Sequence, residues 1–186
     1  LTANDTVQYS AQVAMARHLL GLIDTEVATF SFDGEDAGKI KLSERFWGAA
    51  WDYSLDGGRT WSSGERRDQW INENEYKLSD AEIGQITATE DIKIHLSGVD
   101  WSDANIYTID IVEQVLPSTL YANDWENRVI GVNEKMEWRL NENDPWTSYR
   151  DSSPQRIGDV AVEVRVGRSG KGLPSKSKVF YCRYGY

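Results

Sequence analysis

Residues 160–166 read Val-Ala-Val-Glu-Val-Arg-Val, and this alternation decides the fold class. Successive side chains of a strand point to opposite sides, so the four valines share one face of an extended segment. Residues 91–96 alternate in the same way, with Ile92, Ile94 and Leu96 separated by polar residues. One apolar face per strand is typical of half-buried antiparallel strands. We therefore expect an all-β fold.

Other short runs rich in β-branched and aromatic residues, separated by turn residues, predict further strands. These runs are Thr29–Phe32, Lys39–Leu42, Trp51–Ser54, Ile106–Val112, Arg128–Val132, Lys135–Leu140 and Val179–Tyr184. Two helices are also indicated. Between Asp5 and Leu22, apolar residues recur at spacings of three and four, which predicts one amphipathic helix. At Ser79–Ile83, a capping serine and acidic residues predict a short turn of helix.

The order of the predicted strands repeats along the chain. The turns Ser54–Trp61 and Arg139–Trp146 have equal length, and each ends in a tryptophan. Pro117 lies between the two copies, where it ends the preceding strand. We predict an N-terminal helix and linker over 1–26, a first antiparallel β-sandwich over 27–116 with an insertion at 62–90, and a second over 117–186. One larger sandwich with two similar halves is the alternative.

Composition excludes several classes of function. The 186 residues include 30 Asp and Glu against 20 Lys and Arg, a formal net charge of −10. This balance argues against nucleic acid as a partner, because phosphate binding needs clustered basic residues. No run approaches the ~20 apolar residues of a membrane span. The one cysteine, Cys182, cannot form an intrachain disulfide, and we expect it to be a small buried apolar group.

Residues 54–61, Ser-Leu-Asp-Gly-Gly-Arg-Thr-Trp, resemble an Asp-box, the hairpin turn of sialidase propellers and other secreted β-proteins. Asp56 can accept backbone N–H groups across such a turn, and Gly58 can adopt a positive φ. Trp61 can pack back under the hairpin. A sialidase propeller does not fit into 186 residues. We therefore assign Ser54, Asp56, Gly58 and Trp61 a structural role in the turn.

A second resemblance concerns residues 120–138, which contain Asn-Asp-Trp-Glu-Asn and Met-Glu-Trp. The segment resembles modules of long secreted or surface proteins of Gram-positive bacteria, which carry immunoglobulin-like and fibronectin-like domains after a catalytic head. The resemblance implies tandem immunoglobulin-like domains, an extracellular or cell-surface location, and glycans or another extracellular protein as partners. The chain begins at Leu1, and we expect it to be covalently part of a longer protein. Residues 13–22 also resemble the second helix of a dockerin, without the aspartates of its calcium loop upstream.

Acidic residues allow two further interpretations. Asp33, Glu35 and Asp36 could contribute to a Ca²⁺ site, which needs ~6–8 oxygen ligands, although a solvated acidic turn is the simpler explanation. Pairs such as Asp100 and Asp103 could serve glycoside hydrolysis, which requires two carboxyl groups roughly 5–10 Å apart across a cleft. The sequence gives no sign of a cleft. Calcium is therefore the one cofactor that the sequence allows, and it is not required.

Known catalytic patterns are missing from the sequence. The two histidines, His18 and His95, are not spaced as zinc ligands. The glycine-rich stretch Gly167–Gly172 lacks the Lys-Ser/Thr ending and the helix of a phosphate-binding loop. We assign no catalytic or metal-binding residue, and we expect that the chain is not an enzyme.

Two tryptophans are candidates for sugar binding. Sugar rings stack their apolar C–H faces on exposed aromatic rings, while neighbouring polar groups orient the hydroxyls. Trp101 lies in a polar loop between Asp100 and Asp103, and Trp125 follows Asp124. The alternative is that each ring packs on its own domain. We expect a non-catalytic accessory module, a spacer or interaction module with weak carbohydrate binding. A dedicated carbohydrate-binding module, or a small part of a glycosidase, is the alternative function.

Overall fold

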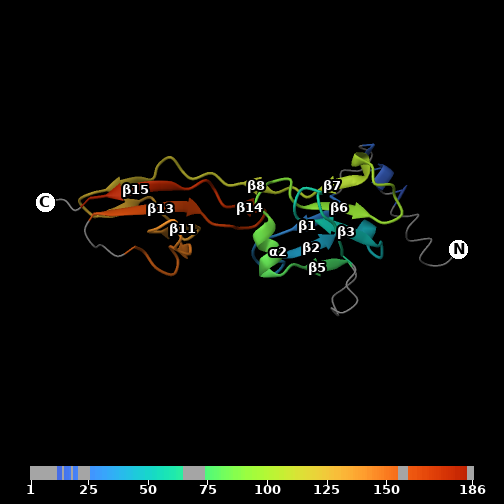
Figure 1. The fold of residues 1–186 in the computed structure, drawn as a ribbon, viewed down its shortest axis with the longest axis horizontal. Coiled ribbons are helices and arrows are strands. Elements are labelled where there is room, and N and C mark those ends of the chain that lie inside the picture. Colours follow the sequence, from blue (N-terminus) through green and yellow to red (C-terminus); the bar gives the residue numbers. More distant parts are fainter. Residues whose placement is uncertain are drawn as a thin grey trace. The chain divides into compact units, whose positions relative to one another are not determined.

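The computed structural model describes residues 12–13, 15–17, 19–20, 26–64, 74–154 and 159–183. These residues form a mostly β structure of several small antiparallel sheets with only short helices (Figure 1). The chain divides into two compact units, Leu1–Val112 and Glu113–Tyr186. Among the described helices, none has the length and apolar character needed to cross a membrane.

Two antiparallel sheets make up most of the first unit. The three-stranded sheet has the order β1 (Ala28–Phe30), β2 (Lys39–Leu42), β5 (Glu75–Lys77). The four-stranded sheet has the order β4 (Ser62–Ser63), β3 (Trp51–Ser54), β6 (Lys93–Leu96), β7 (Ile106–Thr108). Short helical segments are η1 (Glu44–Phe46), α2 (Asp80–Gln85) and η2 (Asp103–Asn105).

Alternation along β3 and β6 builds the core of this unit. Tyr53 pairs with Ile94 across the two strands, and both side chains are buried. Trp51 pairs with Leu96 in the same way. The Tyr53 ring also stacks on Tyr76 of β5, with centroids 5.0 Å apart. Side chains from the two sheets are therefore in direct contact.

The segment predicted as an insertion supplies β5 and α2. Helix α2 begins with a capping box, because the Ser79 hydroxyl accepts from the Glu82 N–H while the Glu82 carboxylate accepts from the Ser79 N–H. The predicted short helix is thus confirmed, and it extends to Gln85. Glu82 also accepts hydrogen bonds from the hydroxyls of Tyr53 (2.9 Å) and Tyr76 (3.3 Å). One carboxylate therefore ties the helix to both sheets.

The N-terminal helix is described in part. Residues 12, 13, 15–17 and 19 are helical. Met15 is buried, and the Gln12 amide donates to the Gly98 carbonyl oxygen, so this helix packs on the first unit. The ends of its predicted span and His18 lie outside the described residues.

The second unit contains a hairpin and a second four-stranded sheet. The hairpin pairs β9 (Tyr121–Asn123) with β10 (Arg128–Ile130). The sheet has the order β12 (Thr147–Ser148), β11 (Met136–Arg139), β13 (Val160–Val166), β15 (Lys178–Cys182), and β11, β13 and β15 run side by side in Figure 1. A further ladder joins β14 (Gly172–Leu173) to β8 (Val112–Glu113).

The valines of β13 lie where their alternation predicts. Val162, Val164 and Val166 are buried, while the residues between them are half-buried. They form one core cluster with Leu120, Val129, Met136, Phe180 and Cys182. The Cys182 thiol is buried and free, as the sequence predicts. Burial raises the pKa of this thiol.

The two four-stranded sheets have the same strand order. In each sheet, a two-residue edge strand (β4 or β12) pairs with the strand that precedes it in the sequence (β3 or β11). That strand pairs with a third (β6 or β13), which pairs with a fourth (β7 or β15). The registers also correspond, since the pair Asp52–His95 in the first sheet matches Glu137–Arg165 in the second. The hydrogen bond from Gly64 N–H to the Trp51 carbonyl matches the one from Tyr149 N–H to the Met136 carbonyl. Positions in the two sheets can therefore be compared one to one.

Some predicted strand boundaries are wrong. Ile106–Val112 is not one strand, because β7 ends at Thr108 and β8 begins at Val112. The predicted strand Arg128–Val132 ends at Ile130, where Gly131 follows with φ +91° and turns the backbone away from the ladder. Strands β4, β5 and β12 are too short to show a period of two in the sequence.

Candidate functional site

The Asp-box-like turn is held by hydrogen bonds within itself. Asp56 Oδ1 accepts from the backbone N–H groups of Arg59 (3.0 Å) and Thr60 (2.9 Å), and Asp56 Oδ2 accepts from the Thr60 hydroxyl (2.7 Å). The Ser54 hydroxyl oxygen accepts from the Gly58 N–H (2.8 Å). Hydrogen bonds from Thr60 above all stabilise the carboxylate and lower the pKa of Asp56 to about 2. The network orders the turn locally.

The turn directs Trp61 onto the outer face of the first four-stranded sheet. The Trp61 Nε1–H donates to the Gly58 carbonyl oxygen (3.1 Å), which fixes the indole under the turn. His95 alternates with the buried Ile94 along β6, so its side chain lies on the face opposite the core. The edge of the Trp61 ring approaches His95, with centroids 6.3 Å apart. Trp61 is therefore part of a surface cluster.

Trp101 completes this cluster, which we call the Trp101 platform and define as Trp61, His95 and Trp101. The indole of Trp101 stacks on the His95 imidazole, with centroids 3.6 Å apart and planes 11° from parallel. Its edge packs against Trp61 at 5.1 Å. Trp101 keeps 55% of its surface exposed, whereas His95 is only 2% exposed. The sequence places His95 on a polar strand face, and it gives no signal that Trp101 covers it.

Asp100 organises the loop that carries Trp101. Its Oδ1 accepts from the Ser102 N–H (3.1 Å), the Ser102 hydroxyl and the Asn105 amide (2.6 Å). These hydrogen bonds, with the Ser102 hydroxyl first, hold the pKa of Asp100 below its usual range. Asp103 begins the η2 segment that follows. The two acidic neighbours of Trp101 thus differ in role, because the Asp100 carboxylate accepts hydrogen bonds within the loop, whereas Asp103 begins the next helical segment.

Two polar groups also lie close to the imidazole of His95. Its Nε2 lies 3.3 Å from the Asp100 carbonyl oxygen, and its Nδ1 lies 3.9 Å from Asp52 Oδ2 on β3. Within the described residues, Nδ1 has no hydrogen-bond partner. Burial raises the pKa of Asp52, and the nearby His95 acts in the opposite direction. The imidazole is therefore held between the sheet and Trp101.

Trp125 occupies the turn of the β9–β10 hairpin in the second unit. Asn127, with φ +47°, closes this turn, and Asp124 Oδ1 accepts from the Arg183 N–H (3.0 Å). Trp125 is 89% exposed, so neighbouring residues cover little of its ring. The two tryptophan candidates belong to different units, and only Trp101 has its ring fixed by stacking.

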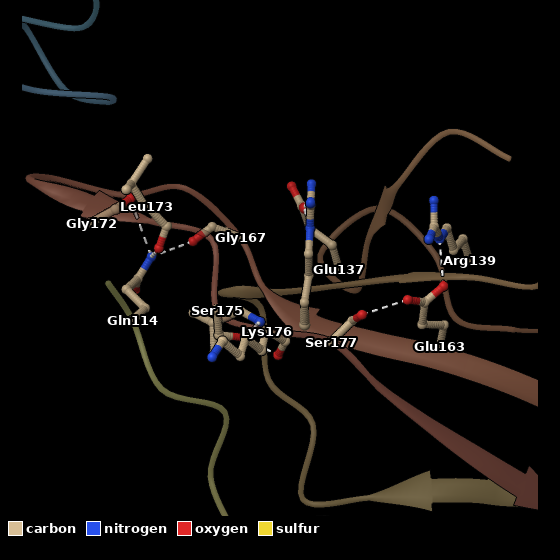
Figure 2. A network of polar contacts seen from close by, with 12 residues as sticks. Gln114, Glu137, Arg139, Glu163, Gly167, Gly172, Leu173, Ser175, Lys176 and Ser177 are labelled. Atoms are coloured by element: carbon tan, nitrogen blue, oxygen red, sulfur yellow. Dashed lines mark hydrogen bonds and ion pairs between the residues drawn. The ribbon is translucent and has the colours of Figure 1, made fainter. Parts of the chain in front are cut away.

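The outer face of the second four-stranded sheet carries charges where the first carries aromatic rings. Arg165 pairs with Glu137 (2.9 Å), and Arg139 Nε donates to Glu163 (2.6 Å). Figure 2 shows Glu163 between Arg139 and Ser177, whose hydroxyl also donates to it. Both arginines lie over the ring of Trp146, the counterpart of Trp61, at 4.0 and 4.5 Å. Two guanidinium groups therefore contact this tryptophan, and each of them is paired with an acid.

A side-chain amide organises the glycine-rich loop of the second unit. The Gln114 amide donates to the carbonyl oxygens of Gly167 and Leu173 (3.1 Å for the latter), as Figure 2 shows. The Ser169 hydroxyl donates to the Gln114 side-chain oxygen (3.3 Å). The predicted hairpin loop is thus closed by backbone carbonyls bound to one side chain.

The acidic turn at Asp33, Glu35 and Asp36 lies between β1 and β2. Both carboxylate oxygens of Asp36 accept from Lys41 Nζ, at 3.0 and 3.1 Å. The described residues contain no group of three or more His, Cys, Asp or Glu side chains arranged to hold a metal ion.

The Trp101 platform is therefore the described surface with the clearest binding geometry. It offers a half-exposed indole whose orientation is fixed by a buried ring. The Ser102 and Asn105 side chains lie in the same loop, and both are tied to Asp100. Interpretation of this surface depends on its geometry, because no protein family, curated protein or solved structure matches the chain.

Proposed function

We propose that the chain is a non-catalytic accessory module of a larger extracellular bacterial protein, and that its first unit binds carbohydrate weakly through the Trp101 platform. One observation carries the proposal. Trp101 is more than half exposed, yet it lies flat on the buried His95. A ring that is already oriented loses little conformational freedom when a ligand stacks on it.

The fold that accompanies this proposal is a tandem of two immunoglobulin-like sandwiches, over 27–116 and 117–186. The matching strand order of the two four-stranded sheets supports it. So do the corresponding registers, in which Asp52–His95 takes the place of Glu137–Arg165. Repeated modules of this kind are common in long extracellular proteins, which is the resemblance that the sequence carries.

Stacking on one indole gives a weak site. The apolar C–H face of a sugar ring covers Trp101, and polar groups of the loop, such as Asp103, orient its hydroxyls. A shallow platform of one exposed ring supplies only a few kcal/mol, which corresponds to dissociation constants near millimolar. Avidity in the longer protein would compensate for this weakness.

The state of Asp100 does not suit the general acid of glycoside hydrolysis. A general acid needs a raised pKa so that it holds its proton near neutral pH. Hydrogen bonds from Ser102 and Asn105 lower the pKa of Asp100 instead. Its Oδ1 is also fully used within the loop. Asp100 therefore acts as a positioning residue for Trp101.

A role as spacer or interaction module is the second candidate. The outer face of the second unit favours it, because Trp146 contacts the guanidinium groups of Arg139 and Arg165, and these are paired with acids. Such a surface is suited to contact with a polar protein surface more than to stacking of a sugar.

The test is calorimetric titration of the full chain with a broad panel of oligosaccharides. We expect at least one ligand with a dissociation constant near millimolar, and we expect Trp101→Ala to abolish its binding. Trp47→Ala is the matched control, because Trp47 is a similarly exposed tryptophan (51%) in the same unit. Circular dichroism shows whether each variant folds. Equal loss of binding in both variants, or no heat with any glycan, would refute carbohydrate binding and leave the spacer role.

A further inference from the structure

The second unit contains a cavity between its hairpin and its main sheet. The cavity has a volume of about 140 Å³. Four valines, a proline and a thiol form its apolar walls, and four further side chains add polar groups. The apolar residues are Val129, Val132, Val160, Val162, Pro154 and Cys182, and the polar ones are Tyr149, Asn127, Arg128 and Ser153. Three of these residues, Val129, Val162 and Cys182, belong to the core cluster of this unit. The cavity therefore reaches into the core itself.

The first unit differs from the second at the position of Tyr149. Gly64 takes the place of Tyr149, and a Cβ on Gly64 would lie 2.3 Å from the Trp51 ring, which covers it. The inserted segment adds the buried side chains of Tyr76, Leu78 and Ile86. In the second unit the equivalent connection is much shorter. Protein interiors are normally close-packed, so a cavity of this size that reaches into the core of the second unit is an exception.

An unpartnered hydroxyl adds a second, independent observation. In the first unit, the hydroxyls of Tyr53 and Tyr76 both donate to Glu82. The Tyr149 hydroxyl is buried as well, but it has no hydrogen-bond partner within the part of the chain that the structure describes. Burial raises the pKa of Tyr149, and the Cys182 thiol on the cavity wall adds to this effect. A buried donor without an acceptor is costly in a folded protein.

We propose that this cavity is a binding site for a small, mainly apolar molecule of about the size of one ring, which carries a carbonyl or ether oxygen that accepts from the Tyr149 hydroxyl. The size is appropriate, because an apolar cavity of about 150 Å³ accepts benzene. The valine walls provide the apolar contact, and Tyr149 provides the orienting hydrogen bond. The site lies in the second unit and does not depend on carbohydrate binding at the Trp101 platform.

The test uses acetophenone, a ring with one carbonyl, and ethylbenzene, a similar ring without an acceptor. Ligand-observed NMR and thermal unfolding are measured on the full chain. We expect saturable binding of acetophenone, about tenfold tighter than ethylbenzene, the scale of one buried hydrogen bond. Tyr149→Phe should remove this preference while both probes still bind. Trp101→Ala should leave both affinities unchanged.

A second set of variants fills the cavity. Val162→Phe should abolish binding of both probes. If this variant does not fold, Val160→Leu replaces it as a smaller addition, and it should weaken binding of both probes. Ile94→Val is the matched control in the first unit, where it should not affect the probes. The proposal is overturned if neither probe binds, if cavity-filling leaves binding intact, or if Tyr149→Phe keeps the preference for acetophenone.

Discussion

The indole of Trp101 lies on the imidazole of His95, with planes 11° from parallel and centroids 3.6 Å apart. This relationship joins a loop residue to a strand residue and buries the histidine on the outer face of the sheet. It also orients the only aromatic ring of the first unit that is both stacked and more than half exposed among the described residues. The Trp101 platform can therefore be tested by substitution of His95 as well as of Trp101.

Replacement of His95 by alanine should weaken glycan binding without unfolding the first unit. The Trp101 ring would lose its stacking partner and sample several orientations, so a ligand would have to order it again. We expect a loss of affinity of about three- to tenfold and a shift of tryptophan fluorescence towards that of a solvated indole. His95→Phe, which keeps a flat ring, should retain more affinity than His95→Ala. An unchanged affinity in His95→Ala would show that the stack does not orient the ligand site.

Replacement of Asp56 by alanine should destabilise the first unit by about 1 kcal/mol, because several donors of the turn lose their acceptor. The turn is largely accessible to water, which can replace part of these hydrogen bonds, so a larger effect is not expected. Glycan affinity should change little. Urea unfolding and calorimetric titration of the same variant separate the two effects, and a loss of affinity at constant stability would place Asp56 in the binding site.

The same residue predicts a pH dependence. The pKa of Asp56 is about 2 in the folded chain, against ~3.9 for an unfolded aspartate. The folded state thus favours the carboxylate, and its contribution is complete above pH ~4–5. It is lost as the pH falls through the interval from ~4 to 2. Asp56→Asn should flatten this part of the stability profile, as measured by urea unfolding between pH 2 and 7. A parallel decline in both proteins would assign the dependence to other groups.

Glu82→Ala should be among the most destabilising changes in the first unit. The variant removes the acceptor of the Tyr53 and Tyr76 hydroxyls and half of the capping box at Ser79. Loss of a charged acceptor that leaves partly buried donors unsatisfied costs ~1–3 kcal/mol, and loss of the cap adds to it. Thermal unfolding should show the change. Glu82→Gln, which keeps an acceptor oxygen, should retain part of the stability, whereas equal losses would mean that the charge alone matters.

The strands that the sequence predicts best are those with a clear period of two. Val160–Val166 has the predicted bounds because its four valines leave only one register with a buried face. Lys39–Leu42 and Trp51–Ser54 also match. Two-residue strands such as β12 carry no period, and they form because their neighbours in the sheet offer hydrogen bonds. Their positions depend on tertiary pairing, which local residue patterns do not encode.

In the candidate site, too, features that depend on local residue patterns can be predicted, and features that depend on tertiary contacts cannot. The turn at residues 54–61 can be predicted from the sequence, because its hydrogen-bond donors and acceptors lie within eight residues of one another. The polar loop at Trp101 is also apparent from the sequence, but its contact with His95 is not. His95 alternates with apolar residues and would be expected in solvent, and only the fold places an indole over it. The cavity beside Tyr149 was likewise not predictable, because it depends on what the shorter connection leaves unfilled.

The last prediction is that the chain hydrolyses no glycoside. Glycosidases place two carboxyl groups across a cleft, one of them with a raised pKa so that it can donate a proton. Asp100 shows the opposite tendency, because Ser102 and Asn105 stabilise its charged form. Chromogenic glycosides incubated with micromolar protein should release no product above the uncatalysed rate. Turnover that disappears in Asp100→Asn and persists in Asp124→Asn, a matched acidic loop residue of the second unit, would show that Asp100 is catalytic and that the first unit is an enzyme.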